Sequence, residues 1–142
     1  METIRIARLR PNAVLPTRKH PQDAGMDLYA AEGKILPAHA SAIIPTGVTI
    51  EIPTGFVGLV KPKGRNDHLV GAGVVDAGYQ GEILVKVVNP YPRPLVINPG
   101  DAIAQMLIVP IQTPSIQEVP AAEIHHQPST RGGSGGIVEQ FK

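Results

Sequence analysis

The 15 prolines and 15 glycines, spread along a chain of 142 residues, constrain this sequence more than any other feature. Proline lacks a backbone donor and breaks a helix when it lies inside one, so prolines at this density leave little room for long helices. Hydrophobic residues nevertheless make up 42% of the chain, whereas disordered chains have low hydrophobicity. We therefore expect many short strands joined by tight turns.

Segments with strand character recur along the chain, with turn signals about every 8–12 residues. Two pairs are predicted to form hairpins: residues 47–52 with 56–61, and residues 73–76 with 82–89. Other strands are expected at Thr3–Leu9, Leu28–Ala31, Ile35–Leu36, Ala42–Ile44, Leu95–Ile97 and Ala102–Pro110, and a short helix at Ala121–His126. The pattern predicts an all-β fold, a sandwich or barrel-like single domain.

Composition excludes several classes of function. The net charge is +1, and no basic stripe indicates direct binding of nucleic acid. Cysteine is absent, which excludes disulfides, thiolate zinc sites and cysteine nucleophiles. The five histidines have no metal-binding spacing. No apolar run approaches the roughly 18 residues that cross a membrane, and no signal-peptide core is present, so we expect a soluble, cytoplasmic protein.

Three polar residues stand where they could serve chemistry. Asp76 lies in a Gly-rich loop and could orient a water or a sugar hydroxyl, although on this segment alone a turn-starting aspartate is favoured. Asp27, which follows Gly25, could hold a hydrated Mg²⁺ or pin an arginine, or could simply begin a strand. Gln105 interrupts an apolar run and needs partners, either in the fold or in a site.

The C-terminal segment is rich in glycine, proline and serine. Its Arg131–Gly136 stretch could form an anion-binding nest with a charged arginine, and a flexible tail explains the same composition equally well. We expect residues 1–126 to form the β domain and residues 127–142 to form a mobile C-terminal arm.

Taken in order, residues 24–30 (AGMDLYA), 71–82 (GAGVVDAGYQGE) and 100–106 (GDAIAQM) resemble the first, third and fourth motifs of the trimeric dUTPases. The resemblance extends from about Ile4 to Gly136. It implies a distorted β-barrel or jelly-roll and a homotrimer with active sites built from three chains. It also implies Mg²⁺-dependent hydrolysis of dUTP to dUMP and pyrophosphate, which keeps uracil out of DNA and supplies dUMP for thymidylate synthesis.

The resemblance also implies roles for individual residues. Asp76 would be the general base and contact the 3′-OH, while Tyr79 would pack under the deoxyribose, where a 2′-OH would clash. The segment containing Gly73 and Val75 would read uracil through backbone groups. Gln105 would contact a phosphate, and Asp27 would hold Mg²⁺ through water. Arg131 would clamp the triphosphate from an arm that closes over a neighbouring active site.

Two motifs depart from the family pattern. The second, usually Pro-Arg-Ser-Gly, is represented by the shortened segment Pro62–His68; we assign its arginine place to Arg65 and its phosphate-binding serine place to Asn66. The fifth usually carries an aromatic residue that covers the uracil, and that place falls on Gly136 and Ile137. A stacked aromatic contributes about 1–3 kcal/mol per base, so slower catalysis or looser base preference is expected.

Three alternatives remain open. The chain could be a non-catalytic nucleotide-binding member of the same fold, or could prefer another deoxynucleoside triphosphate. A deaminase of the related dCTP family would need an additional catalytic carboxylate, for which Glu82 is suggestively placed. The third motif matches the dUTPases better, so hydrolysis is favoured over deamination.

Overall fold

The structure, a computed structural model, describes residues 3–125, and its regular elements are almost entirely strands. The all-β prediction is confirmed. The strands are β1 Arg5–Arg8, β2 Gly25–Tyr29, β3 Lys34–Leu36, β4 Ser41–Pro45, β5 Val48–Glu51, β6 Phe56–Lys61, β7 Leu69–Val70, β8 Gly73–Val75, β9 Leu84–Val88, β10 Leu95–Ile97 and β11 Ala102–Pro110.

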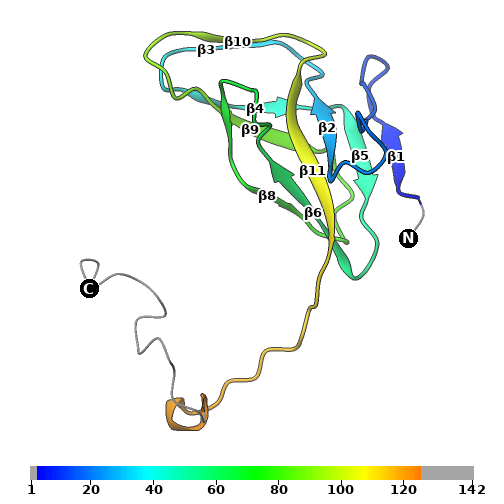
Figure 1. The fold of residues 1–142 in the computed structure, drawn as a ribbon, viewed down its shortest axis with the longest axis vertical. Helices are drawn as coiled ribbons and strands as arrows, with labels where there is room; N and C mark the ends of the chain where they lie inside the picture. Colours follow the sequence, from blue (N-terminus) through cyan, green and yellow to red (C-terminus); the bar gives the residue numbers. More distant parts are fainter. Residues whose placement is uncertain (1–2, 126–142) are drawn as a thin grey trace. The chain divides into compact units, whose positions relative to one another are not determined.

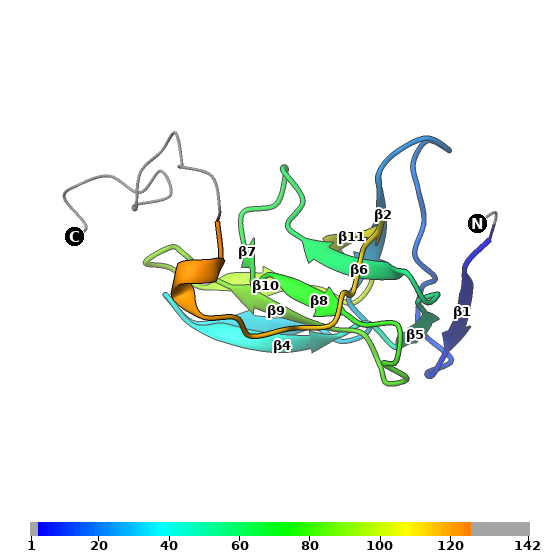
Figure 2. The same ribbon diagram turned by 90° about the horizontal axis from the view of Figure 1, so that it is seen from below.

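The strands form four small antiparallel sheets. The largest has the order β2-β11-β6-β8, the next has the order β4-β9-β7, and the remaining two are the pairs β1-β5 and β10-β3. Figure 1 shows β11 in the middle of the largest sheet, and Figure 2 shows β4 and β9 in a layer below β11 and β6. The longest strand therefore has a partner on both sides.

The sheets enclose one apolar core. Strand β9 alternates as expected for a half-buried strand, with Val85 and Val87 buried and Leu84 exposed. Strand β11 breaks this alternation, because Ile103 and Ala104 are consecutive and both fully buried. The register against β2 shifts at this point, from Ala102↔Tyr29 to Ala104↔Leu28, which is the signature of a β-bulge.

Both predicted hairpins are wrong in their pairing, although their turns exist. The Phe56 amide donates to the Pro53 carbonyl at 3.1 Å, yet β5 pairs with β1, and β6 pairs with β11 and β8. In the same way β8 pairs with β6, whereas β9 pairs with β4 and β7. Each connection carries the chain from one sheet to another, so long-range pairing overrides the local hairpin signal.

A second compact unit begins at Thr113. Its described part contains a single turn of 3₁₀ helix, Ala121–Glu123, where a short helix over Ala121–His126 was predicted. His126 lies outside the described residues. Within residues 3–125, no helix has the length and apolar character needed to span a membrane.

Asn89 is a fully buried polar residue that fastens the end of β9 to the core. Its side-chain nitrogen donates to the carbonyls of Leu36, Pro37 and Arg93 at 3.3, 3.1 and 2.7 Å, and its oxygen accepts from the Tyr91 amide at 3.0 Å. A buried amide with this set of partners keeps the surrounding backbone groups satisfied.

We predict that Asn89→Asp destabilises the fold strongly. The introduced carboxylate would face carbonyl oxygens with no proton to donate, and leaving such a charge unpaired in a buried site costs about 3–5 kcal/mol. The loss should shrink toward pH 4, because the introduced group must be protonated in the folded state and ionises near pH 4 when unfolded. Urea unfolding at pH 7 and pH 4 checks this; equal stability of variant and parent at pH 7 would contradict it.

Candidate active site

The loop between β8 and β9 exposes the carboxylate of Asp76. The Tyr79 amide donates to the Asp76 carbonyl at 3.0 Å, which closes a four-residue turn with residues 76–80 all exposed. Beside the turn lies a small groove of about 190 Å³ that includes Asp76, Tyr79, Gly73 and Val75 in its lining. A carboxylate at the rim of a groove is in a position to accept a proton from a water bound there.

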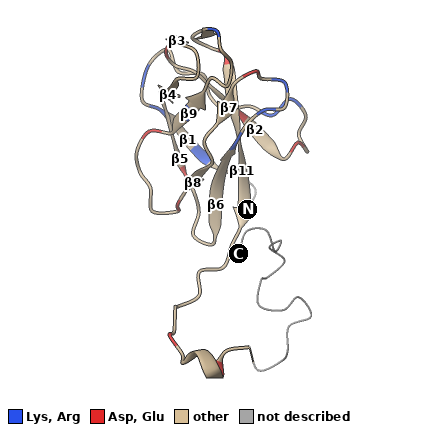
Figure 3. Ribbon diagram, turned by 90° about the vertical axis from the view of Figure 1, so that its left-hand side faces the viewer, with Lys and Arg blue, Asp and Glu red and all other residues tan. Residues whose placement is uncertain are grey.

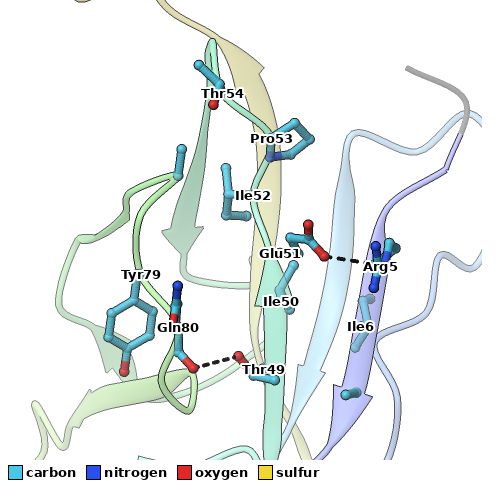
Figure 4. A pocket seen from close by; sticks show the side chains of 12 residues that line it. Arg5, Ile6, Thr49, Ile50, Glu51, Ile52, Pro53, Thr54, Tyr79 and Gln80 are labelled. Atoms are coloured by element: carbon cyan, nitrogen blue, oxygen red, sulfur yellow. Dashed lines mark hydrogen bonds and ion pairs between the residues drawn. The ribbon is translucent and has the colours of Figure 1, made fainter.

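The Tyr79 ring is held in one orientation. Its hydroxyl donates to the Glu82 carbonyl at 2.5 Å. The ring can lie there because Gly81 has no side chain: a Cβ at that position would stand 2.6 Å from the Tyr79 hydroxyl oxygen. The other side of the loop is tied to β5, where the Thr49 hydroxyl donates to the Gln80 carbonyl at 3.3 Å (Figure 4).

Glu82 anchors this loop through its side chain. Its carboxylate accepts from the Gly47 amide at 2.8 Å and from Arg10 Nη2 at 3.4 Å. Arg10 also donates to Glu32 at 2.5 Å, and this hydrogen bond, reinforced by the charge of Glu82, raises the pKa of the Arg10 guanidinium. The Glu82 carboxylate is thus committed to structural contacts, which weakens the case for it as the additional acid of a deaminase.

Strand β8 presents an open backbone edge to the groove. It is the last strand of its sheet, and among the described residues its only strand partner is β6, through Gly73↔Val60 and Gly58↔Val75. The edge of β8 that faces away from β6 therefore carries N–H and C=O groups available to a ligand. The Val75 side chain is buried, so Val75 can offer a ligand only its backbone.

A second group of polar residues gathers where β2, β11 and β6 lie side by side. Gln105 is opposite Asp27 of β2 and opposite Lys61 of β6. The Gln105 amide nitrogen donates to the Pro62 carbonyl at 3.0 Å. The Gln105 side chain fills the space in which a Cβ of residue 25 would stand, which explains the glycine at that position.

Lys63 completes this group, and the sequence interpretation missed it. Its ammonium lies 2.5 Å from Asp27 Oδ1, and both side chains are about one quarter exposed, at 27% and 23%. The signal was available: Lys63 directly follows Pro62, as the arginine does in Pro-Arg-Ser-Gly. Arg65, to which the arginine place was assigned, is exposed, and its neighbour Asn66 directs its amide to the Ala102 carbonyl at 2.9 Å.

The two groups of residues are not brought together within one chain. Gln105 is level with Lys61 at one end of β6, whereas Asp76 follows Val75, which is opposite Gly58. Lys61 and Gly58 are three residues apart on β6, so Gln105 and Val75 are offset by roughly 10 Å along the strand direction. Asp76 is one residue farther. The structure thus joins Asp27 with Gln105, and Gly73 with Asp76 and Tyr79.

A larger depression, of about 570 Å³, lies on the far side of Tyr79 and Gln80 against β1 and β5 (Figure 4). Its one basic residue, Arg5, is paired with Glu51 at 3.3 Å. By contrast, Lys61, Lys63 and Arg65 put three cations on one short segment beside Gln105, while elsewhere basic and acidic stretches are interspersed over the ribbon (Figure 3). Positive charge therefore gathers beside Gln105 and not in this depression. Arg131, Gly136 and Ile137 lie outside the described residues.

Comparison with known proteins identifies the class of this chain. The dUTPase family model matches residues 11–136. The deoxyuridine 5′-triphosphate nucleotidohydrolases of Mycobacterium marinum and Mycobacterium tuberculosis are each 40% identical over 141 residues, covering 94% of this chain and 92% of theirs.

Solved structures agree with the sequence relatives. The dUTPase of Staphylococcus bacteriophage 80alpha, solved with dUpNHpp, superposes with a TM-score of 0.86 at 29% identity, covering 95% of this chain and 96% of that one. A mutant dUTPase from phage phi11 of S. aureus, whose structure concerns the coordination of a structural Mg(II) ion, has a TM-score of 0.78 at 30% identity, covering 83% of this chain and 97% of that one.

The fold and the comparisons together define an all-β nucleotide hydrolase. The chain belongs to the dUTPase family, and its activity is that of a dUTP nucleotidohydrolase. The fold and function implied by the three sequence motifs are confirmed.

We predict that Gly81→Ala impairs dUTP hydrolysis by displacing the Tyr79 ring. Its matched control is Gly78→Ala in the same loop, where an added Cβ meets nothing within 4 Å. Steady-state kinetics with dUTP should show kcat/KM about tenfold lower for Gly81→Ala, because the ring would lose a hydrogen bond and its position in the groove, and near the parent value for Gly78→Ala. Equal effects of the two variants would contradict the proposed role of Gly81.

Proposed function

We propose that the chain cleaves dUTP between its α and β phosphates, with Asp76 as the general base that activates the attacking water. Within residues 3–125, no hydrogen-bond donor or cation contacts the Asp76 carboxylate. A carboxylate without such partners keeps its lone pairs free for a water or for the 3′-OH of the sugar. The single observation that carries the proposal is this exposed carboxylate at the rim of a groove beside an open strand edge.

Uracil recognition follows from the open edge of β8. Uracil offers one N–H donor flanked by carbonyl acceptors, and a strand edge offers the complementary C=O and N–H groups. We propose that the backbone of Gly73 and Val75 reads the base in this way. The Tyr79 ring, held by the Glu82 carbonyl, would lie under the deoxyribose and leave no room for a 2′-OH.

The phosphates would bind at the second group of residues. We propose that Gln105 donates to a phosphate and that Arg65, which is exposed, contributes a charged fork. Asn66 remains a predicted phosphate contact that would have to release the Ala102 carbonyl first. Arg131 is proposed to clamp the triphosphate from an arm, residues 127–142, that closes over a neighbouring site, with residues 1–126 as the β domain.

Mg²⁺ is proposed as the cofactor, held through water by Asp27. Among the described residues no cluster of three or more His, Asp or Glu side chains forms a direct metal cage. Asp27 fits a hydrated ion instead: it is partly exposed, and the contact made by Lys63 is to one of its two oxygens. Mg²⁺ usually keeps several waters and binds one or two carboxylates plus substrate phosphates, where it neutralises negative charge.

The separation of the two groups supports a site shared between chains. If one nucleotide contacts both Asp76 and Gln105, and the two lie at different levels of the same sheet, a neighbouring chain can supply one of them. We propose a homotrimer, in which each site combines residues of different chains.

Replacing Asp76 tests the proposed chemistry. Asp76→Asn keeps the side-chain shape and removes the base, so kcat for pyrophosphate release from dUTP should fall at least 100-fold. Calorimetric affinity for a non-hydrolysable dUTP analogue should stay within about threefold of the parent. Pyrophosphate release by the parent protein no faster than by Asp76→Asn would refute the proposal and favour a nucleotide-binding role.

Mixing two inactive variants tests the shared site. Co-expressed Asp76→Asn and Gln105→Ala chains should regain about a quarter of the parent activity, because random assembly gives that share of sites with both residues intact on different chains. The matched control is the Asp76→Asn/Gln105→Ala double variant co-expressed with Asp76→Asn, which supplies Gln105 but no Asp76 and should stay inactive. If the two single variants mix without any recovery, both residues serve one chain's site.

A further inference from the structure

The segment Pro62–Asp67, which connects β6 to the buried His68, is fastened at both ends. At its start the Pro62 carbonyl accepts from Gln105, and Lys63 contacts Asp27. Within the segment the backbone N–H of Asn66 donates to the Lys63 carbonyl at 3.2 Å and closes a turn. Its far end is fastened by the side chains of Asn66 and His68, and we call this segment the phosphate loop.

The far end is held by β11 at its bulge. The Asn66 side-chain nitrogen lies 2.9 Å from the Ala102 carbonyl oxygen, and His68 Nε2 lies 2.7 Å from the Ile103 carbonyl oxygen. Consecutive carbonyls of a regular strand point to opposite sides, so two neighbouring ones reached from the same segment require the local distortion of a bulge. The register shift at Ala102/Ala104 supplies it.

These side chains take the place of a missing strand partner. Strand β6 pairs with β11 only from Gln105 onward, because β6 ends at Lys61. The buried Ile103 carbonyl and the partly buried Ala102 carbonyl would be costly to leave without donors. Asn66 and His68 supply the donors, and doing so brings their own chain segment against the start of β11.

The donor chemistry is specific. A distance of 2.7 Å to a carbonyl oxygen requires a proton on His68 Nε2, which therefore acts as a donor. The contact of Asn66 Nδ2 with the same ring nitrogen, at 3.3 Å, then joins two donors, so the productive bond of Asn66 is the one to Ala102. His68 is only 6% exposed while its neighbours Asp67 and Leu69 are exposed, so His68 is the anchor of the segment.

We infer that Asn66 and His68 are positioning residues: by satisfying the bulged carbonyls of β11 they hold the phosphate loop so that Lys63 and Pro62 stay aligned with Asp27 and Gln105. This inference rests on the proposed roles of Gln105 at a phosphate and of Asp27 at a hydrated Mg²⁺. It gives Asn66 an indirect role in place of direct phosphate contact. The short loop, held at both ends by non-covalent contacts, keeps the Lys63 and Pro62 positions fixed relative to β2 and β11.

Two substitutions at His68 separate the effect of losing its N–H donor from the effect of losing its ring. His68→Phe keeps a planar ring and removes the donor, whereas His68→Gln keeps an N–H that reaches a similar position. Asp67→Asn, between the two anchors and exposed, is the matched surface control. The full chain of each variant is titrated with α,β-imido-dUTP in Mg²⁺ and, separately, with 2′-deoxyuridine, which carries no phosphate.

His68→Phe should weaken binding of the imido analogue about tenfold and leave deoxyuridine binding within about twofold, with His68→Gln and Asp67→Asn near the parent. In the background of Lys63→Ala, His68→Phe should add little, because both changes act on one loop. Equal losses for both ligands, equal losses in the Phe and Gln variants, or full additivity with Lys63→Ala would each overturn the inference.

The Asn66 series covers the case in which His68→Phe folds poorly. Asn66→Ala should reproduce the phosphate-specific loss, and Asn66→Ser, too short to reach Ala102, should share it. If Asn66 instead touched phosphate as a serine would, Asn66→Ser would bind the analogue as well as the parent, and that result would overturn the positioning role. Binding of both ligands by the parent without pyrophosphate release from dUTP would refute the proposed function and leave this test intact.

Discussion

The pairing of β11 with a strand on each side is the constraint on which the rest of the structure depends. A strand in the middle of a sheet needs partners for both of its edges. Strand β11 pairs with β2 between Ala102 and Leu107 and with β6 between Gln105 and Pro110, so both of its edges are paired from Gln105 to Leu107. That register fixes Gln105 level with Asp27 and Lys61. Beyond the end of β6, the side chains of Asn66 and His68 donate to the β11 carbonyls in place of a strand partner. The segment after β6 is held against the sheet as a consequence.

The proposed nucleotide site draws on the two ends of this sheet. At one end the register gathers Asp27, Gln105 and Lys63, which suit phosphate and a hydrated cation. At the other, β8 is an edge strand with one strand partner within residues 3–125, and the turn after it exposes Asp76. We propose that neighbouring chains bring the two ends together at one nucleotide. In this proposal one end of the sheet binds the phosphates and the cation, and the other binds the base.

Much of the fold could be predicted from the sequence, because strand character and turn chemistry are local. Strands such as Phe56–Lys61 and Ala102–Pro110 appear with the predicted bounds. Pairing could not be predicted in the same way: the turn at Pro53–Gly55 forms, yet β5 and β6 pair with strands far away in the chain, and local turn signals do not specify such long-range partners. Asp76, Gln105 and Asp27 were predicted as site residues from ordered motifs, and their roles stay predictions. Lys63 was missed because an arginine was expected, and the anchoring by Asn66 and His68 depends on a bulge that periodicity does not reveal.

The central claim is that Asp76 and the phosphate-binding residues of different chains meet at one nucleotide. A crystal structure of the assembled full chain with α,β-imido-dUTP and Mg²⁺ tests it most directly. We expect an Asp76 carboxylate oxygen about 2.6–3.2 Å from a water that lies in line with the α-phosphorus, with Gln105 and Arg65 of another chain at the phosphates. An Asp76 side chain directed away from the nucleotide, or Asp76 and Gln105 of one chain on the same nucleotide, would contradict it.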